Sequence, residues 1–320
     1  MGEILGLQEG DPVEVHKALI KMIRYAYNEL VDSPPFQNRS IKNVFPGVQI
    51  NTREFYFKEP TLVDEITSCY QSTQSDGDVY VVPSIHQANE AQPLHEKADF
   101  YPELKANCAL AEKWNSKNIT VHLPVRTDND IDEVIELLTS KNCIEIIKGT
   151  PGIYQPSIDL ENNHHNTFFG DLDNCSAFMA KLDDKLDEIG ASFLKQNINF
   201  CFDSGHYLTQ AHLMGYNKRD MLARFFKTQA NRIKTLHLHK NDGIGKDQHI
   251  LLGIEPDTNN SIGFTKVEPA LLAEHEAILL ECLPLLGFLE KDNWNIVLET
   301  DKWYTPDLLA QSLKLIYNHL

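Results

Sequence analysis

Short apolar segments alternate with longer amphipathic segments along the whole chain, and this alternation predicts the fold class. The apolar segments resemble β-strands, and we expect strands over 4–7, 47–51, 79–86, 119–125, 157–161, 198–203, 235–239 and 295–299. In the longer segments apolar residues recur every three or four positions, as on one face of a helix. The segment that contains Phe178, Leu182, Leu186 and Ile189 is an example.

Capping residues and prolines indicate where the helices begin and end. Asp11 can cap the first helix and Pro12 fits its first turn. This helix is expected to end near Leu30, because Pro34 forbids its continuation. Further helices are expected from about position 61, over about 101–115, 131–138, 220–233 and 271–285, and in a last segment opened by Thr305 and Pro306.

The eight strand–helix units follow one another without a break in composition, which predicts a parallel sheet with helical crossovers. In a chain of 320 residues this favours a single closed (β/α)8 TIM barrel, a fold of typically ~250 residues. The alternative is a doubly wound open sheet, but no G-x-G-x-x-G follows the first strand. We therefore expect one α/β TIM-barrel domain over 1–320.

The charge of the chain restricts its partners. Lys and Arg total 29 and Asp and Glu total 46, so the formal net charge is −17 and repels nucleic acid and anionic lipid. Hydrophobic residues make up 42%, which suffices for a sizeable core, yet no apolar run approaches the ~20 residues of a membrane span. We expect a small-molecule substrate and no nucleic-acid or membrane partner. The composition is compatible with a homo-oligomer.

The six cysteines are scattered and none forms a C-x-x-C pair. This spacing argues against a structural zinc knot and a thioredoxin-type site, and favours reduced thiols in a cytoplasmic protein. The first seven residues lack a basic leader, so we expect no signal peptide.

Imidazole and carboxylate side chains gather at or just after the ends of the later predicted strands, where TIM barrels carry their chemistry. The candidates are His86, His122, Glu161, Asp203, His206, His237, His239, Asp247, His249 and Glu299. This donor set suits Zn²⁺, Mn²⁺, Fe²⁺ or Co²⁺. Placement after six successive strands, more than any single residue, predicts a metal centre.

Several of these residues have simpler interpretations. His86 or His122 alone would more often bond to backbone, and Asp203 fits as the cap of the following helix. Glu255, Glu274 and Glu276 are expected to be solvated carboxylates, and the histidine pair at 164–165 is expected to lie in a polar loop.

His237 and His239 are two apart on a predicted strand, so both should face the barrel interior. One of them is sufficient for metal binding, and the other can contact substrate. Asp247 and His249 are again two apart, and Gly243 and Gly245 before them permit a sharp bend.

At these residues the sequence resembles the xylose-isomerase-like TIM-barrel superfamily of sugar and sugar-phosphate isomerases, epimerases and endonuclease IV-like (AP endonuclease family 2) proteins. The matching stretches are Val121-His-Leu-Pro, Leu160-Glu-Asn-Asn, Phe202-Asp-Ser-Gly-His206, Leu236-His-Leu-His-Lys-Asn-Asp-Gly243 with Asp247-Gln-His249, and Val297-Leu-Glu299. Together they span the chain from about His86 to its C-terminus in the order of the family motifs.

The resemblance implies a ligand set. The endonuclease-IV-like pattern of nine ligands for three ions falls on His86, His122, Glu161, Asp203, His206, His237, Asp247, His249 and Glu299. The smaller set of the sugar isomerases falls on Glu161, Asp203, His237 and Glu299. The loop before Asp247 lacks the arginine expected of a DNA-gripping loop, which disfavours DNA as substrate.

Two enzymatic hypotheses follow, and between them they use one to three divalent ions, one in the first and two or three in the second. The first is an isomerase or epimerase of a small sugar, sugar phosphate or polyol, with Glu161 and Glu299 as catalytic base and acid and with His239 and Lys240 as substrate contacts. The second is a phosphoester hydrolase with a multinuclear site, in which the additional histidines hold further ions. Redox chemistry at an iron cluster and an inactive binding protein rank below these two.

Overall fold

The computed structural model describes residues 12–31, 47–51, 60–75, 82–87, 97–123, 131–149, 155–163, 167–244, 248–255, 268–287, 294–299 and 305–320. In these ranges seven strands form one sheet in chain order, and every neighbouring pair is parallel. The strands are β1 (Gly47–Asn51), β2 (Val82–Gln87), β3 (Asn118–His122), β4 (Ser157–Glu161), β5 (Ile198–Asp203), β6 (Ile233–Leu238) and β7 (Asn295–Leu298).

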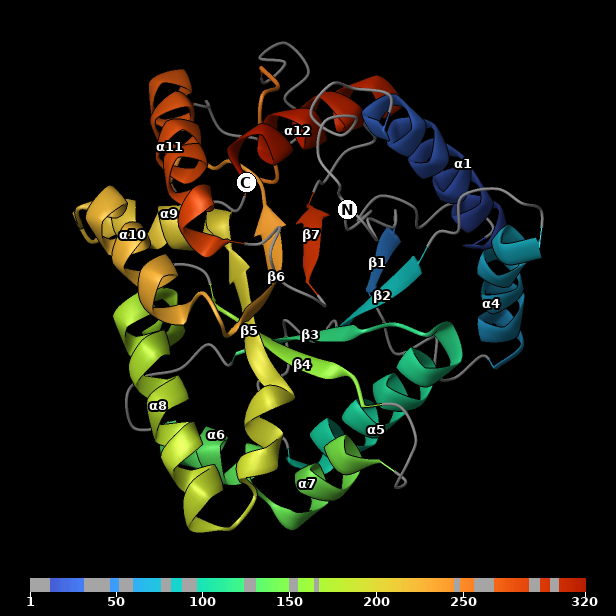
Figure 1. Ribbon diagram of the computed structural model, residues 1–320, viewed down its shortest axis with the longest axis vertical. Coiled ribbons are helices and arrows are strands. Elements are labelled where there is room, and N and C mark those ends of the chain that lie inside the picture. Colours follow the sequence, from blue (N-terminus) through green and yellow to red (C-terminus); the bar gives the residue numbers. More distant parts are fainter. Residues whose placement is uncertain are drawn as a thin grey trace.

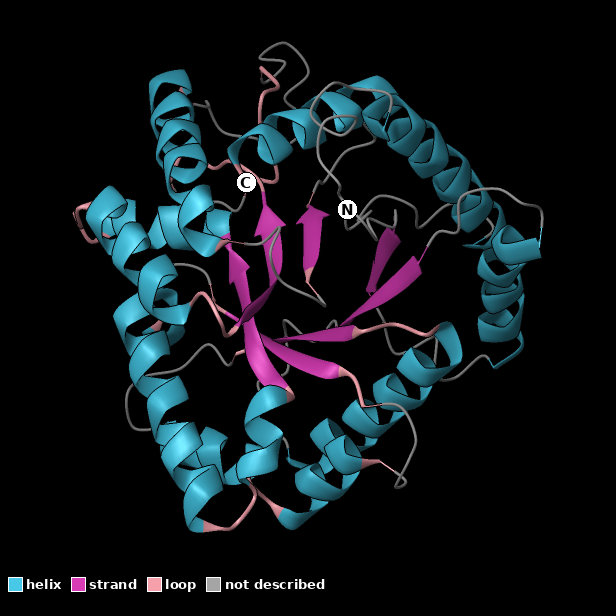
Figure 2. Ribbon diagram, in the orientation of Figure 1, coloured by secondary structure: helices cyan, strands magenta, loops and turns pink. Residues whose placement is uncertain are grey.

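The sheet curls around a central interior, and the helices lie outside it as a ring (Figure 1; Figure 2). The helices are α1 (Pro12–Val31), α4 (Pro60–Ser75), α5 (Lys97–Trp114), α6 (Ile131–Leu138), α7 (Lys141–Lys148), α8 (Leu172–Glu188), α9 (Ser204–Leu213), α10 (Lys218–Gln229), α11 (Pro269–Cys282) and α12 (Pro306–His319). The ring closes where α1 packs against α12, with Leu30 and Tyr317 buried together. No helix of the described ranges is long and apolar enough to cross a bilayer.

This arrangement confirms the prediction of a parallel α/β sheet with helical crossovers. Strands β1, β4 and β5 coincide with their predicted ranges. The strand expected at 4–7 and the loop histidines at 164–165 lie outside the described residues.

Two helices, α7 and α9, were not predicted from the sequence. The sequence of α9 has no amphipathic pattern because the helix is buried on every side from Ser204 to Ala211. Helix α7 has only eight residues and begins directly after Ser140, whose side chain accepts a hydrogen bond from the backbone N–H of Cys143.

The strands present alternate residues to two different environments. In β3, Ile119 and Val121 join the hydrophobic core under the helices, whereas Thr120 accepts a hydrogen bond from Gln49 at 3.0 Å. In β4, Asp159 accepts a hydrogen bond at 2.6 Å from Thr235 of β6, a strand that is not its neighbour in the sheet. Such a contact is only made across the concave face, so the interior of the curled sheet is lined by polar side chains.

Asp159 is the centre of a polar layer below the strand ends. It is fully buried and accepts hydrogen bonds from Ser157, Asn118 and Thr235. Burial raises its pKa, although these three hydrogen bonds act in the opposite direction. The layer ties β3, β4 and β6 together and so fixes their relative positions two to four residues before each strand ends.

The free energy of unfolding should depend on pH through two buried histidines that lie on helices, His16 of α1 and His275 of α11. His16 of α1 is 5% exposed and bonds through Nδ1 to the Tyr70 hydroxyl at 2.8 Å. Burial lowers the pKa of His16, and that of His275, from 6.5 to about 4. Between these pH values the unfolded chain binds more protons than the folded chain, so the free energy of unfolding falls as pH falls from about 6.5 towards 4.

We expect each histidine to contribute about 2–3 kcal/mol to this loss at about pH 4.5. In urea denaturation, His16→Gln should lose less stability than the wild type when the pH is lowered from about 7 to about 4.5. Equal losses in the two proteins would contradict the assignment to His16.

Candidate metal centre

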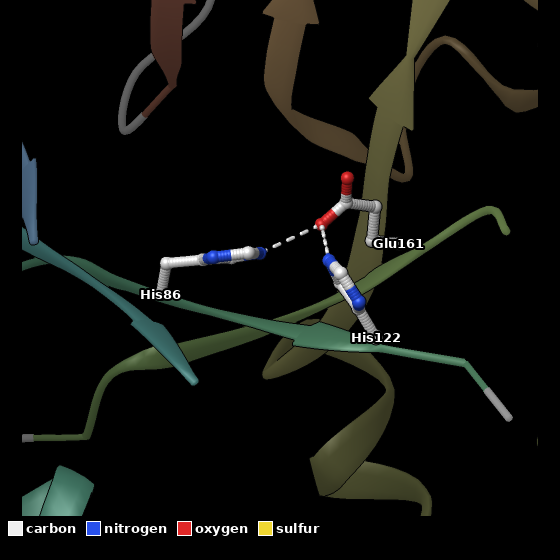
Figure 3. A group of neighbouring side chains, drawn as sticks. All are labelled: His86, His122 and Glu161. Atoms are coloured by element: carbon white, nitrogen blue, oxygen red, sulfur yellow. Dashed lines mark hydrogen bonds and ion pairs between the residues drawn. The ribbon is translucent and has the colours of Figure 1, made fainter. Parts of the chain in front are cut away.

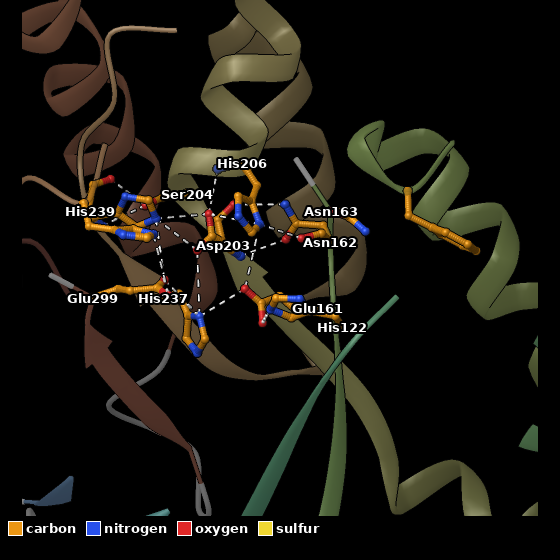
Figure 4. A network of polar contacts seen from close by, with 12 residues as sticks. His122, Glu161, Asn162, Asn163, Asp203, Ser204, His206, His237, His239 and Glu299 are labelled. Carbon is orange, nitrogen blue, oxygen red and sulfur yellow. Dashed lines mark hydrogen bonds and ion pairs between the residues drawn. The ribbon is translucent and has the colours of Figure 1, made fainter. Parts of the chain in front are cut away.

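The carboxyl ends of the parallel strands deliver the predicted donors to one place (Figure 4). His86 lies on β2 and His122 ends β3, Glu161 ends β4, Asp203 ends β5 and His237 lies on β6, while His239 and Glu299 directly follow β6 and β7. Each of these residues except His122 is at most 5% exposed. Parallel strands end at the same edge, so residues more than 200 positions apart in sequence become neighbours.

Glu161 forms a first donor group with the histidines of β2 and β3. Its Oε2 lies 3.0 Å from His86 Nε2 and 3.1 Å from His122 Nε2 (Figure 3). One ligand atom of each residue lies within 4.8 Å of the others.

The second group uses the other oxygen of the same carboxylate. Glu161 Oε1 lies 3.1 Å from His237 Nδ1, which in turn lies 3.2 Å from Glu299 Oε2 and 3.8 Å from Asp203 Oδ2. These four residues again offer ligand atoms within 4.8 Å of one another. They are the four residues of the sugar-isomerase-like set.

A third group joins His239, His249 and Glu299. His239 Nε2 lies 3.6 Å from Glu299 Oε2, and His249 Nε2 lies 3.7 Å from Glu299 Oε1. The sequence left open whether His237 or His239 is a ligand, and the structure places both in donor groups. Glu161 and Glu299 each present their two oxygens to two different groups.

Buried polar atoms at the centre test whether these residues fit a cation. Glu161 Oε1, Glu299 Oε2 and both ring nitrogens of His237 are buried and make no hydrogen bond of acceptable geometry. Leaving such groups unsatisfied costs about 1–3 kcal/mol each. Imidazole nitrogen and carboxylate oxygen are ligands of divalent transition-metal ions, so the donor set fits such an ion.

The electrostatics of the centre also suit a cation. Burial alone would raise the pKa of Glu161 and of Glu299, but histidine charges outweigh burial and lower both pKa values. The histidines are His237 and His122 at Glu161, and His249 and His237 at Glu299. Both carboxylates are therefore ionised.

The pKa values of His237 and Asp203 are likewise set by burial and by the neighbouring charged groups. Burial alone would lower the pKa of His237, but Cys201, Glu161 and Glu299 raise it well above its usual value. For Asp203, burial is outweighed by His206 and His239, which lower its pKa.

Asp203 has both roles that the sequence allowed. It is the N-cap of α9, where its Oδ1 accepts the backbone N–H of His206 at 2.6 Å, and its Oδ2 lies 3.0 Å from His239 Nε2. Capping therefore holds the carboxylate in place against the donor groups.

Asn162 and Ser204 fix the strand ends and were not among the predicted site residues. Asn162 Oδ1 accepts the Asp203 N–H at 2.7 Å, and its Nδ2 donates to the Asp203 carbonyl at 3.0 Å. Ser204 Oγ donates to the His239 carbonyl at 2.7 Å and accepts the His239 N–H at 3.0 Å. Asn162 lies in the Leu160-Glu-Asn-Asn motif, and this motif was the sequence signal for its role.

Two of the predicted residues that the structure describes, His206 and Lys240, belong to none of the donor groups. Nδ1 of His206 donates to the Asn162 carbonyl at 2.9 Å and lies 3.6 Å from Asp203 Oδ1, but His206 belongs to none of the groups formed by the described residues. Asp247, which was predicted as a ligand together with His249, lies outside the described residues.

Lys240 has a structural partner. Its ammonium is buried and lies 3.1 Å from Glu276 of α11, whose carboxylate also accepts the Gly253 N–H at 2.6 Å. The expectation of a solvated Glu276 is therefore wrong, because this carboxylate neutralises a buried lysine.

Gly205 explains the glycine in the D-x-G-H motif. A Cβ at this position would lie 2.0 Å from Cε1 of the His239 ring. Only glycine therefore lets this ring lie against α9 with its Nε2 at Asp203.

We expect Gly205→Ala to cost about 1–3 kcal/mol of stability, because the methyl group overpacks a buried ring. In a His239→Ala background the ring is gone, and the same substitution should be neutral or stabilise by up to about 1 kcal/mol through helix propensity. Chemical denaturation of the four proteins of this cycle measures both terms. An equal cost in both backgrounds would refute the close contact.

No protein-family model matches the sequence, and no curated protein matches it either. Solved structures match in fold. D-allulose 3-epimerase from Methylomonas sp. in complex with D-allulose has a TM-score of 0.55 at 11% identity, over 96% of this chain and 92% of that one. The 3-keto-D-glucoside 4-epimerase YcjR from E. coli has a TM-score of 0.55 at 10% identity, over 98% and 96%.

The IolI protein with a bound zinc atom has a TM-score of 0.50 at 13% identity, over 85% of this chain and 89% of that one. At these identities the likeness is one of fold. It confirms the resemblance to the xylose-isomerase-like superfamily at that level.

Proposed function

We propose that this chain, which shares the fold of the xylose-isomerase-like superfamily, is a divalent-metal-dependent isomerase or epimerase of a small polyhydroxylated substrate. The observation that carries the proposal is the placement of Glu161 and Glu299 on two sides of His237, at 3.1 and 3.2 Å from its Nδ1. The two solved epimerases with the same fold support it.

Glu161, Asp203, His237 and Glu299 would hold the ion, which when bound polarises a carbonyl group and makes the neighbouring C–H bond more acidic. The ionised carboxylates of Glu161 and Glu299 come from opposite parts of the sheet, so one of them can accept the proton from one side of a substrate carbon. The other, or a histidine of the centre, returns a proton from the other side. The polar interior suits hydroxyl groups of the substrate.

Proton exchange with solvent tests this reaction directly. In D₂O, wild-type protein loaded with Zn²⁺, Mn²⁺ or Co²⁺ should introduce deuterium next to the carbonyl of at least one ketohexose or ketose phosphate, followed by NMR. Glu161→Gln and Glu299→Gln should each lower the exchange rate about 10²–10⁴-fold, because each removes a proton-transferring group. Glu274→Gln, at a surface carboxylate that pairs with Lys218, is the matched control and should retain the rate.

Absence of exchange from a broad panel of ketoses, aldoses and their phosphates would reject the isomerase. So would undiminished exchange in both glutamine variants.

A multinuclear phosphoester hydrolase is the second candidate, and one observation favours it. Because both oxygens of Glu161 and of Glu299 face neighbouring donors, these residues would offer enough ligand atoms to hold more than one ion. Further ions there would supply hydroxide and stabilise the leaving oxygen.

The net charge of −17 disfavours DNA as its substrate. We expect no cleavage of a duplex with an abasic site, whereas release of phosphate from small phosphate esters by metal-loaded protein would favour this candidate over the isomerase.

Three sequence predictions belong with this proposal. A strand at 4–7 between β7 and β1 would complete a (β/α)8 barrel, and the packing of α1 on α12 supports closure there. The six free cysteines support a cytoplasmic location. A small-molecule substrate without a nucleic-acid or membrane partner is in keeping with the charge, and a homo-oligomer stays open.

A further inference from the structure

Cys201 differs from the other five cysteines in its surroundings. Those five lie on the outer helices α4, α5, α7, α8 and α11, whereas Cys201 lies on β5, two residues before Asp203. Asn199, Cys201 and Asp203 share the inner face of the strand, and Cys201 is paired in the sheet directly with Glu161. This thiol, which is fully buried, therefore lies among the polar groups of the interior and is not part of the hydrophobic cluster under the helices.

The thiol is close to two of the donors described above. Cys201 Sγ, a carboxylate oxygen of Glu161 and a ring nitrogen of His237 lie within 4.8 Å of one another. Sulfur and a nitrogen or oxygen ligand of one tetrahedral zinc ion lie about 3.6 Å apart, given bonds of about 2.3 Å and about 2.1 Å. Side-chain movements of about 1 Å therefore suffice to bring the three atoms onto one ion.

The ring of His237 provides an independent observation. Its Nδ1 lies 3.1 Å from Glu161 Oε1, but neither ring nitrogen nor Glu161 Oε1 makes a hydrogen bond of acceptable geometry, and all three atoms are buried. The side chain with which Cys201 interacts is this same ring, whereas a buried cysteine with a structural role bonds to backbone. Cys175, which is equally buried, donates to the carbonyl of Phe169 at 3.3 Å.

We infer that Cys201 is a thiolate ligand of the ion held by Glu161 and His237, an inference that rests on the metal centre of the proposed function. On binding, the S–H bond breaks, its proton passes to solvent, and sulfur bonds to the ion without a change of oxidation state. A sulfur donor makes the centre softer than an all-nitrogen and oxygen site. The centre then prefers Zn²⁺, Fe²⁺ or Co²⁺ to Mn²⁺ and Mg²⁺.

Cobalt substitution tests this inference without a substrate. We expect Co²⁺ added to metal-free wild-type protein to give a thiolate-to-cobalt charge-transfer band in the near ultraviolet. Cys201→Ser, which preserves the size of the side chain, should still bind Co²⁺ through the remaining donors but lack the band. Cys175→Ser is the matched control, a buried cysteine outside the centre, and should retain it.

Competition between metals gives a second readout. Cys201→Ser should weaken Zn²⁺ binding about tenfold or more, because a ligand is lost, and should change Mn²⁺ binding much less. The wild-type spectrum alone keeps the test decisive even where a variant fails to fold.

Co²⁺ bound to the wild type without the band would overturn the inference and leave the proposed function standing. A band that persists in Cys201→Ser would overturn it as well. Failure of the wild type to bind Co²⁺ or Zn²⁺ at all would overturn both.

Discussion

The centre depends on one shared carboxylate. Glu161 ends β4, is 1% exposed, and presents one oxygen to His86 and His122 and the other to His237. A buried carboxylate is costly unless cations or hydrogen-bond donors surround it. The histidines at the neighbouring strand ends, and the cation that they can hold with it, meet this requirement. The arrangement of the donors follows from the need to neutralise this one group.

Polar side chains in the interior of the sheet also fix the strands at the level below the donor residues. Polar side chains hydrogen-bond across the concave face of the sheet, where Gln49 donates to Thr120 and Thr235 donates to Asp159. These bonds fix the strands directly below the donors, while Asn162 and Ser204 fix the strand ends at the level of the donors. Rigid positioning from both sides holds carboxylates and imidazoles near 3 Å in an arrangement that a flexible interior would not maintain.

The sequence predicted the parallel sheet from the spacing of apolar residues, and it predicted most of the donor residues from their positions at strand ends. Alternating strands and helices gave the parallel sheet, and donors at successive strand ends had to meet, since parallel strands end at one edge. Helix α9 was missed because complete burial removes the amphipathic pattern. Cys201 was missed because only the pairing of β4 with β5 shows which donors lie beside it. The contact of Gly205 with His239 likewise depends on tertiary packing.

These strand ends are expected to hold a divalent ion, and the metal content of the protein tests this most directly. Protein purified without added metal or chelator is analysed for bound metals by mass spectrometry, together with an Asp203→Asn/His237→Gln double variant. We expect at least one divalent transition-metal ion per wild-type chain and a clear loss in the variant. A wild-type chain without metal that also gains none on dialysis against Zn²⁺, Mn²⁺, Fe²⁺ or Co²⁺ would contradict the account.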